Sequence, residues 1–199
     1  GKAISWGDFI APHINASDEF EKVVSTIGGF AGLTTDGQVY AWGSGQYGGW
    51  TGNMLTPGHT SSHLQSGIID IFPLNMGAFG AINNQGELIA WGGEHFIDSN
   101  LFEGFFSRFD GPVIDGVGSY HGFTILHQDP MLGWNNMYST GNFMVYFEEF
   151  QDVYATDWGF LALSENRTIE FADGRHTNAY GASPYVHFST VSEHIQGTN

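Results

Sequence analysis

The chain has 199 residues, 21 of them acidic and five of them Lys or Arg, which gives a formal net charge of −16. Affinity for nucleic acids comes largely from Lys and Arg that neutralise phosphates, so this charge excludes a nucleic-acid partner. The sequence has 29 glycines and no cysteine, which excludes disulfides and thiolate metal sites. It also lacks the 18-residue apolar run that indicates a membrane span.

The first predicted element lies at the N-terminus, where residues 2–8 read as a short strand that contains the pair Trp6-Gly7. A fuller version of this pattern follows at residues 29–43, "GFAGLTTDGQVYAWG". It predicts a strand that contains Phe30, a polar turn that ends in Gly, and an alternating strand that contains Trp42.

The same pattern returns at residues 78–92, "AFGAINNQGELIAWG", with Phe79 and Trp91 as the matching aromatic residues. Each of them lies 49 positions after its counterpart in the first copy. A fixed period in this range is the signature of a repeat architecture.

Two weaker copies follow. Residues 122–135 keep the Gly-Phe pair at Phe123, an Asp-Pro turn and a tryptophan at Trp134. Residues 159–174 keep the Gly-Phe pair at Phe160, but an alanine stands at the tryptophan position. A short β-branched run precedes each of the four copies and predicts one more strand ahead of each Gly-Phe strand.

The two ends of the chain each look like half a unit. Residues 188–199 resemble the opening strands of a unit without its Trp-Gly strand, and residues 2–8 supply such a strand. Joined head to tail, the ends meet at Asn199 and Gly1, and Asn-Gly is a strong hairpin signal. The sequence therefore predicts a unit divided between the ends. Its halves belong either to one copy, which closes a ring, or to two copies, which link into an array.

These features predict an all-β fold: a β-propeller of four-stranded blades in a single domain. The fourth, outer strand is expected in the polar stretch after each Trp-Gly strand, such as residues 44–65. Four whole units and the divided unit predict five blades, one of them shared between the two ends. The predicted units are residues 22–67, 68–111, 112–150 and 151–187, with the divided unit at 188–199 plus 1–8.

The stretch "DGQVYAWGSGQYGG", residues 36–49, resembles the repeats of the regulator of chromosome condensation family. The resemblance extends over residues 22–181 and the terminal half-units. It implies a β-propeller, usually of seven blades, in a family that includes nucleotide-exchange factors for a small GTPase, inhibitors of secreted enzymes and domains of large surface proteins. The chain departs from the family in blade number, in its shortened units, and in Phe where many members have His. Only structural Gly, Phe and Trp positions are carried over.

The recurring aromatic residues are predicted to be buried packing positions. They are Trp6, Phe30, Trp42, Phe79, Trp91, Phe123, Trp134 and Phe160. The candidates for an exposed binding rim are the aromatic residues outside the repeat register: Tyr47, Trp50, Tyr120 and Trp158. No residues have the order or spacing of a catalytic, metal or cofactor site. The acidic group Glu148, Glu149 and Asp152 is interpreted as charged turn residues.

The sequence therefore predicts a protein without enzymatic activity. The first hypothesis is a structural module of a larger extracellular assembly, a fibre or surface protein, whose partners are further copies of itself or of a longer repeat chain. The second is a protein-binding propeller, an inhibitor or adaptor that uses one rim. The acidic, Lys-poor surface and the divided unit favour the first. The start at Gly1 without Met predicts a processed product or part of a longer chain.

Overall fold

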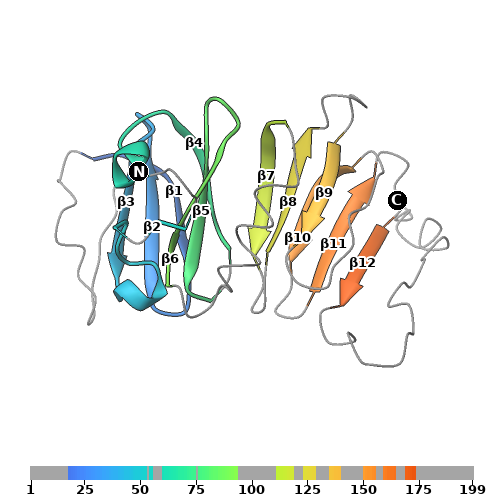
Figure 1. Cartoon of the computed structure of the whole chain (residues 1–199), viewed down its shortest axis with the longest axis horizontal. Coiled ribbons are helices and arrows are strands. Elements are labelled where there is room, and N and C mark those ends of the chain that lie inside the picture. The colour runs from blue at the N-terminus through green and yellow to red at the C-terminus, as the bar shows by residue number, and fades with distance from the viewer. Residues whose placement is uncertain are drawn as a thin grey trace, which may run out of the picture.

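The computed structural model of the chain (Figure 1) is all-β. It describes residues 18–52, 54–55, 60–74, 76–93, 111–118, 123–128, 135–139, 150–155, 159–164 and 169–173. These residues form twelve strands in four antiparallel sheets of three. Among them, no helix has the length and apolar character needed to cross a membrane.

Each sheet corresponds to one predicted repeat, and its strands follow one another in chain order. Sheet 1 contains β1 (Phe20–Ser25), β2 (Gly29–Thr34) and β3 (Val39–Gly43). Sheet 2 contains β4 (Ile68–Pro73), β5 (Ala78–Asn83) and β6 (Leu88–Gly92). Sheet 3 contains β7 (Val113–Gly118), β8 (Phe123–Gln128) and β9 (Asn135–Ser139). Sheet 4 contains β10 (Phe150–Ala155), β11 (Gly159–Ser164) and β12 (Ile169–Asp173).

The hairpin turns form where the repeat places its polar residues and glycine. Gly37 and Gly86 have φ angles of 81° and 78°, a left-handed conformation that favours glycine. In the second sheet, the side-chain oxygen of Asn83 accepts hydrogen bonds from the backbone N–H groups of Gln85 (3.0 Å) and Glu87 (2.9 Å). These local bonds fix the register of each Gly-Phe strand against its Trp-Gly strand.

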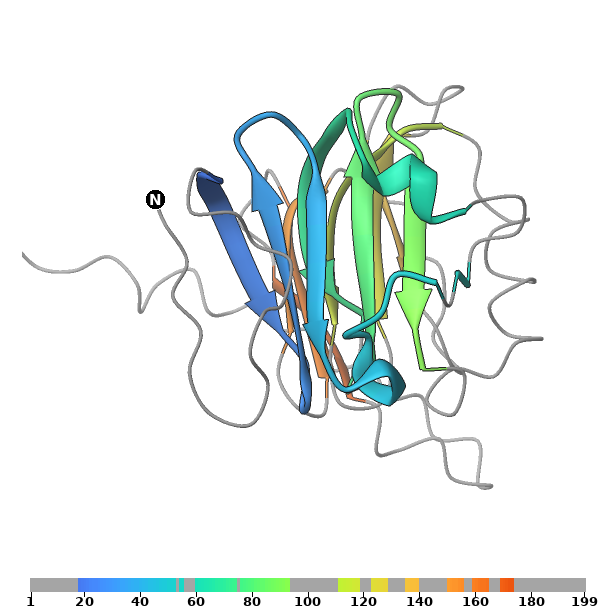
Figure 2. The same ribbon diagram turned by 90° about the vertical axis from the view of Figure 1, so that its left-hand side faces the viewer.

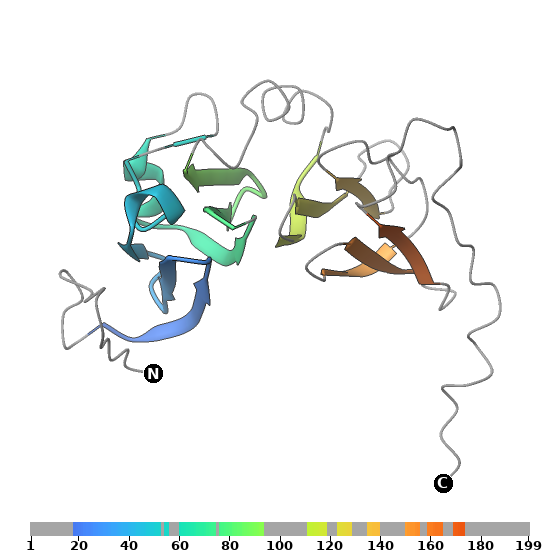
Figure 3. The ribbon, with the colours of Figure 1, turned by 90° about the horizontal axis from the view of Figure 1, so that it is seen from below.

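The first strand of every sheet carries a β-bulge at the same place, one residue after its first paired residue. These first strands also lie next to one another, β1 beside β4, β4 beside β7, and β7 beside β10. They are therefore the inner strands of the array. Figure 3 shows the four sheets following an arc, with sheets 1 and 4 at its two ends.

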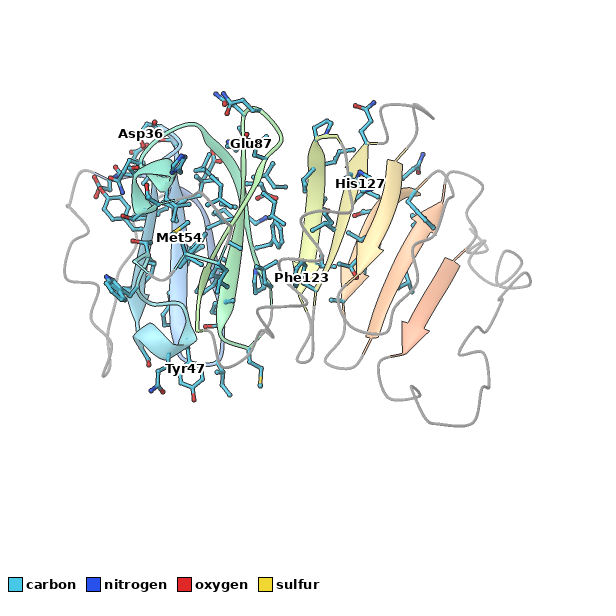
Figure 4. The ribbon with its side chains drawn as sticks, in the orientation of Figure 1. Asp36, Tyr47, Met54, Glu87, Phe123 and His127 are labelled. Atoms are coloured by element: carbon cyan, nitrogen blue, oxygen red, sulfur yellow. The ribbon has the colours of Figure 1, made fainter. Side chains whose placement is uncertain are left out.

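The sheets stack by one rule. We call the side of each sheet that carries the Phe of its Gly-Phe strand the front face, and the opposite side the rear face. The rear face of sheet 1 packs on the front face of sheet 2, and the rear face of sheet 2 packs on the front face of sheet 3. The rear face of sheet 3 packs likewise on sheet 4. In Figure 4, Phe123 lies between sheets 2 and 3.

A fourth strand position is occupied in sheet 2, but not as the sequence predicts. Met54 forms an antiparallel bridge with Trp91, and the Leu55 N–H donates to the Ala90 carbonyl at 2.8 Å. The polar stretch after the Trp-Gly strand of the first unit therefore pairs with the outer strand of the next sheet, not with its own. This crossover ties consecutive units together.

Candidate binding surfaces

The front face of sheet 1 is apolar and incompletely covered. Its side chains follow from strand alternation and register: Phe20, Val23, Phe30, Tyr40 and Trp42. The Phe30 side chain is 38% exposed, whereas its repeat equivalents Phe79 and Phe123 are 0% and 1% exposed. Figure 2 looks at the molecule from the side of sheet 1. The prediction that this recurring phenylalanine is buried is therefore wrong for Phe30 and confirmed for Phe79 and Phe123.

The aromatic arrangement on this face repeats that of the buried one. The rings of Phe30 and Trp42 stack with centroids 5.6 Å apart, and those of Phe79 and Trp91 stack at 5.5 Å. Phe20 adds an edge-on contact with the Trp42 ring at 6.4 Å. The same ring pair is thus fully buried in sheet 2, whereas in sheet 1 Trp42 is buried, at 7% exposure, and Phe30 is exposed.

The two tryptophans also differ in their hydrogen bonds. The Trp91 indole N–H donates to the Gly48 carbonyl at 3.1 Å. A side chain at Gly48, which has a φ of 85°, would lie 2.6 Å from the Phe79 ring. The glycine-rich loop of the first unit therefore seals the ring pair of sheet 2. Among the residues that the structure describes, nothing accepts a hydrogen bond from the Trp42 indole.

The rear face of sheet 4, at the other end of the arc, is also exposed. Tyr154 is 48% exposed, and Leu161 and Leu163 of β11 are only partly buried. Their counterparts on the rear face of sheet 2 include Phe72, at 3%, and Ile82, at 0%. Among the described sheets, the first therefore has a partly exposed front face, on which Phe20 and Trp42 are 6% and 7% exposed, and the last has a partly exposed rear face.

The structure describes two of the four rim candidates, and they differ in exposure. Trp50 is 61% exposed. Tyr47 is half-buried and lies at the opposite end of the sheets from the turn residue Asp36 (Figure 4). The remaining predicted positions fall outside the described residues or have side chains that are not described: Trp6, Tyr120, Trp134, Trp158 and Phe160.

A row of charged residues follows the inner strands, each just after a bulge: Lys22, Asp70, Asp115 and Asp152. The Lys22 ammonium contacts the Asp70 carboxylate at 2.6 Å. Each aspartate accepts a hydrogen bond from the N–H of the following residue, at 2.7 to 3.0 Å. The carboxylates therefore accept hydrogen bonds from backbone N–H groups that the bulges take out of the regular pairing between strands.

Sequence reasoning missed this row. Asp152 was interpreted as a turn residue, but it lies in β10. The available signal is an aspartate two positions after the first buried residue of β4, β7 and β10. It becomes visible only when the first strands are aligned with one another, because the repeat is easiest to recognise in the Gly-Phe and Trp-Gly strands.

Burial is the main cause that raises the pKa of Asp115. The charges of Asp70 and Asp152 raise this pKa as well, while the Gly116 N–H and Lys22 lower it. Because the folded state holds the Asp115 proton more tightly than the unfolded state, stability is lost as the pH rises through the raised pKa. Ionised Asp115 therefore lowers the stability at neutral pH, mainly because burial disfavours its charge.

The variant Asp115→Asn is therefore expected to be more stable than the parent at pH 7, and to lose this advantage at pH 3, below the ordinary carboxyl pKa of about 3.9. Thermal unfolding at the two pH values measures the difference. Glu21→Gln removes one exposed charge outside the row and is the matched control. A variant that is equally or less stable at pH 7 contradicts the proposed destabilisation by ionised Asp115.

Comparison with known proteins agrees with this architecture. Residues 27–48 match the regulator of chromosome condensation (RCC1) repeat. No curated protein matches the chain in sequence. Among solved structures, yeast RCC1 (Prp20) bound to Kap60 superposes with a TM-score of 0.55 and 13% identity, over 82% of this chain and 45% of that one.

Two further structures have the same fold. The CRINKLY WD40 ectodomain of the Arabidopsis thaliana receptor kinase ACR4 gives a TM-score of 0.54 and 11% identity, over 84% of this chain and 56% of that one. Human WBSCR16 gives 0.51 and 16%, over 79% of this chain and 48% of that one. The chain thus spans about half the length of these structures. The repeat match and the shared fold identify the chain as a β-propeller that contains an RCC1-type repeat at residues 27–48.

Proposed function

We propose that the chain is a non-enzymatic structural module of a larger extracellular assembly, in which another β-sheet covers the front face of sheet 1. The observation that carries this proposal is the exposure of Phe30, at 38%, and of Val23, at 48%. Their equivalents in sheet 2, Phe79 and Ile71, are 0% exposed. Covering this face would remove apolar area from water, which stabilises by roughly 25 cal/mol per Å².

The chemistry of the face favours a protein sheet as the partner. The front faces of sheets 2 and 3 are each covered by the rear face of the preceding sheet. A face of the same composition therefore fits the same kind of surface. Two comparisons support a protein partner and an extracellular place: yeast RCC1 was solved bound to Kap60, and the ACR4 structure is a receptor ectodomain. The net charge of −16 argues against nucleic acid as the partner, because affinity for nucleic acid comes largely from Lys and Arg.

A second candidate is protein binding through a rim, and one observation favours it. Trp50 is 61% exposed, and its ring lies against Gly52, where an added Cβ would come within 2.3 Å of it. Exposed tryptophans held in one orientation are common anchors in protein interfaces. In this alternative the protein acts as an inhibitor or adaptor, and the front face of sheet 1 plays no part.

A neutral apolar dye, Nile red, separates the two candidates at dilute protein concentration. The proposal predicts that the parent binds the dye and that Phe30→Glu removes most of the fluorescence, while Trp50→Glu leaves it unchanged. Circular dichroism confirms that both variants keep their β-structure. Dye binding that depends on Trp50 favours the rim. A parent that binds no dye contradicts an uncovered front face.

A further inference from the structure

We propose that the bulges of the inner strands form a further binding surface, which takes a basic, aliphatic segment of another protein. The surface consists of two exposed isoleucines and the three aspartates that follow the bulges: Ile69, Ile114, Asp70, Asp115 and Asp152. We call it the bulge surface. It shares no residue with the front face of sheet 1, so the inference does not depend on the proposed function.

The apolar part of the bulge surface comes from the residues that two bulges insert. Ile69 of β4 and Ile114 of β7 each lie between two paired positions of their strand, and they are 58% and 46% exposed. The two strands contact each other and carry their bulges at the same place. The inserted residues of β1 and β10 are instead polar, Glu21 and Gln151. Two neighbouring aliphatic side chains are therefore available to bury apolar area against a partner.

The carboxylates beside these isoleucines are held in one orientation, and one of them already holds a cation. The Asp70 Oδ1 accepts a hydrogen bond from the Ile71 N–H at 2.8 Å, and the Lys22 ammonium of the preceding sheet contacts the same oxygen at 2.6 Å. The Asp115 Oδ1 accepts the equivalent bond from the Gly116 N–H at 2.7 Å. Asp115 thus presents a carboxylate oriented in the same way as the one that binds the ammonium group at Asp70.

The cation that Lys22 supplies has no counterpart in the next two sheets. In the repeat, Asp70 takes the position of Lys22 beside Asp115, and Asp115 takes it beside Asp152. Among the residues that the structure describes, Lys22 and Asp70 form the one ion pair of the row. The negative charges of Asp70 and Asp152 both act on Asp115. A Lys or Arg side chain of a partner would compensate this excess of negative charge.

The combination of aliphatic and acidic groups favours a protein segment over a bare cation. Lys and Arg lay their aliphatic stems along apolar surface while the charged end reaches a carboxylate, and Ile114 directly precedes Asp115. Within the described part of the chain, no group of three acidic or His side chains could hold a metal ion. Ionised Asp115 also lowers the stability at neutral pH, mainly through burial. A charged group kept at such a cost is typical of a functional position.

Fluorescence anisotropy with a labelled peptide of alternating arginine and valine tests the inference. We expect the parent to bind this peptide more tightly than one of alternating arginine and glycine, which has the same charge but no aliphatic side chains. Asp115→Asn and Ile114→Ser should each weaken binding by about tenfold or more, the effect of losing one charge-assisted hydrogen bond or one buried aliphatic side chain. Because Asp115→Asn is expected to be more stable than the parent at pH 7, unfolding would not explain its loss of binding.

Two control variants separate the bulge surface from the rest of the molecule. Glu19→Gln removes one exposed negative charge elsewhere, and Phe30→Gln alters the front face of sheet 1 without changing the charge. Both should bind the peptide like the parent. If Glu19→Gln weakens binding as much as Asp115→Asn does, net charge alone attracts the peptide and the inference is overturned. Equal binding by the parent, Asp115→Asn and Ile114→Ser also overturns it, and leaves the dye test of the front face unaffected.

Discussion

Replacing Trp91 with alanine is expected to lower the free energy of unfolding by about 3–5 kcal/mol, the range for removing a large buried aromatic side chain. Trp91 is 0% exposed and stacks on the Phe79 ring. Its indole N–H also donates to the Gly48 carbonyl, so the substitution leaves that buried acceptor without its partner. The residue joins three parts of the fold: sheet 2, the rear face of sheet 1, and the glycine-rich loop of the first unit.

Equilibrium unfolding in urea measures this loss. Trp50→Ala is the matched control, because Trp50 is 61% exposed, and its cost should stay near the ~0.5 kcal/mol typical of surface changes. Trp42→Ala should fall between the two, since Trp42 is 7% exposed but stacks on Phe30, which is 38% exposed. A Trp91→Ala loss below about 1 kcal/mol contradicts the assignment of this tryptophan to the core.

The strands and turns could be predicted from the sequence because they depend on local patterns. Alternation of apolar residues marks β2, β3, β5 and β6, and glycine at Gly37 and Gly86 supplies the left-handed turn position. The β-branched runs ahead of each Gly-Phe strand likewise became β1, β4, β7 and β10. The period of 49 residues then implied repeated sheets and a propeller.

Contacts between units could not be predicted in the same way. Phe30 and Phe79 occupy the same repeat position, and their different exposures depend on whether a preceding sheet covers them. The pairing of Met54 with Trp91 depends on the path of a loop across to the next sheet. Neither relation is encoded in a residue's immediate neighbours, so both became visible only in the folded chain.

The candidate surface follows from this difference. A repeat protein buries each unit against its neighbours, and the faces of its terminal units need a cap or a partner. In this chain the first sheet presents an aromatic front face of the core type rather than a polar cap. The sequence could indicate which residues form that face. Whether their side chains are exposed depends on the position of the unit in the array.

The central claim is that the front face of sheet 1 is an apolar surface that can dock another sheet, with Phe30 exposed on it at 38%. Nile red fluorescence of the variant Phe30→Glu tests this claim most directly. Ile27→Glu is the matched control, because Ile27 is 67% exposed and lies in the turn between β1 and β2. We expect Phe30→Glu to lose most of the dye fluorescence of the parent and Ile27→Glu to keep it. Equal fluorescence from the two variants would contradict the claim.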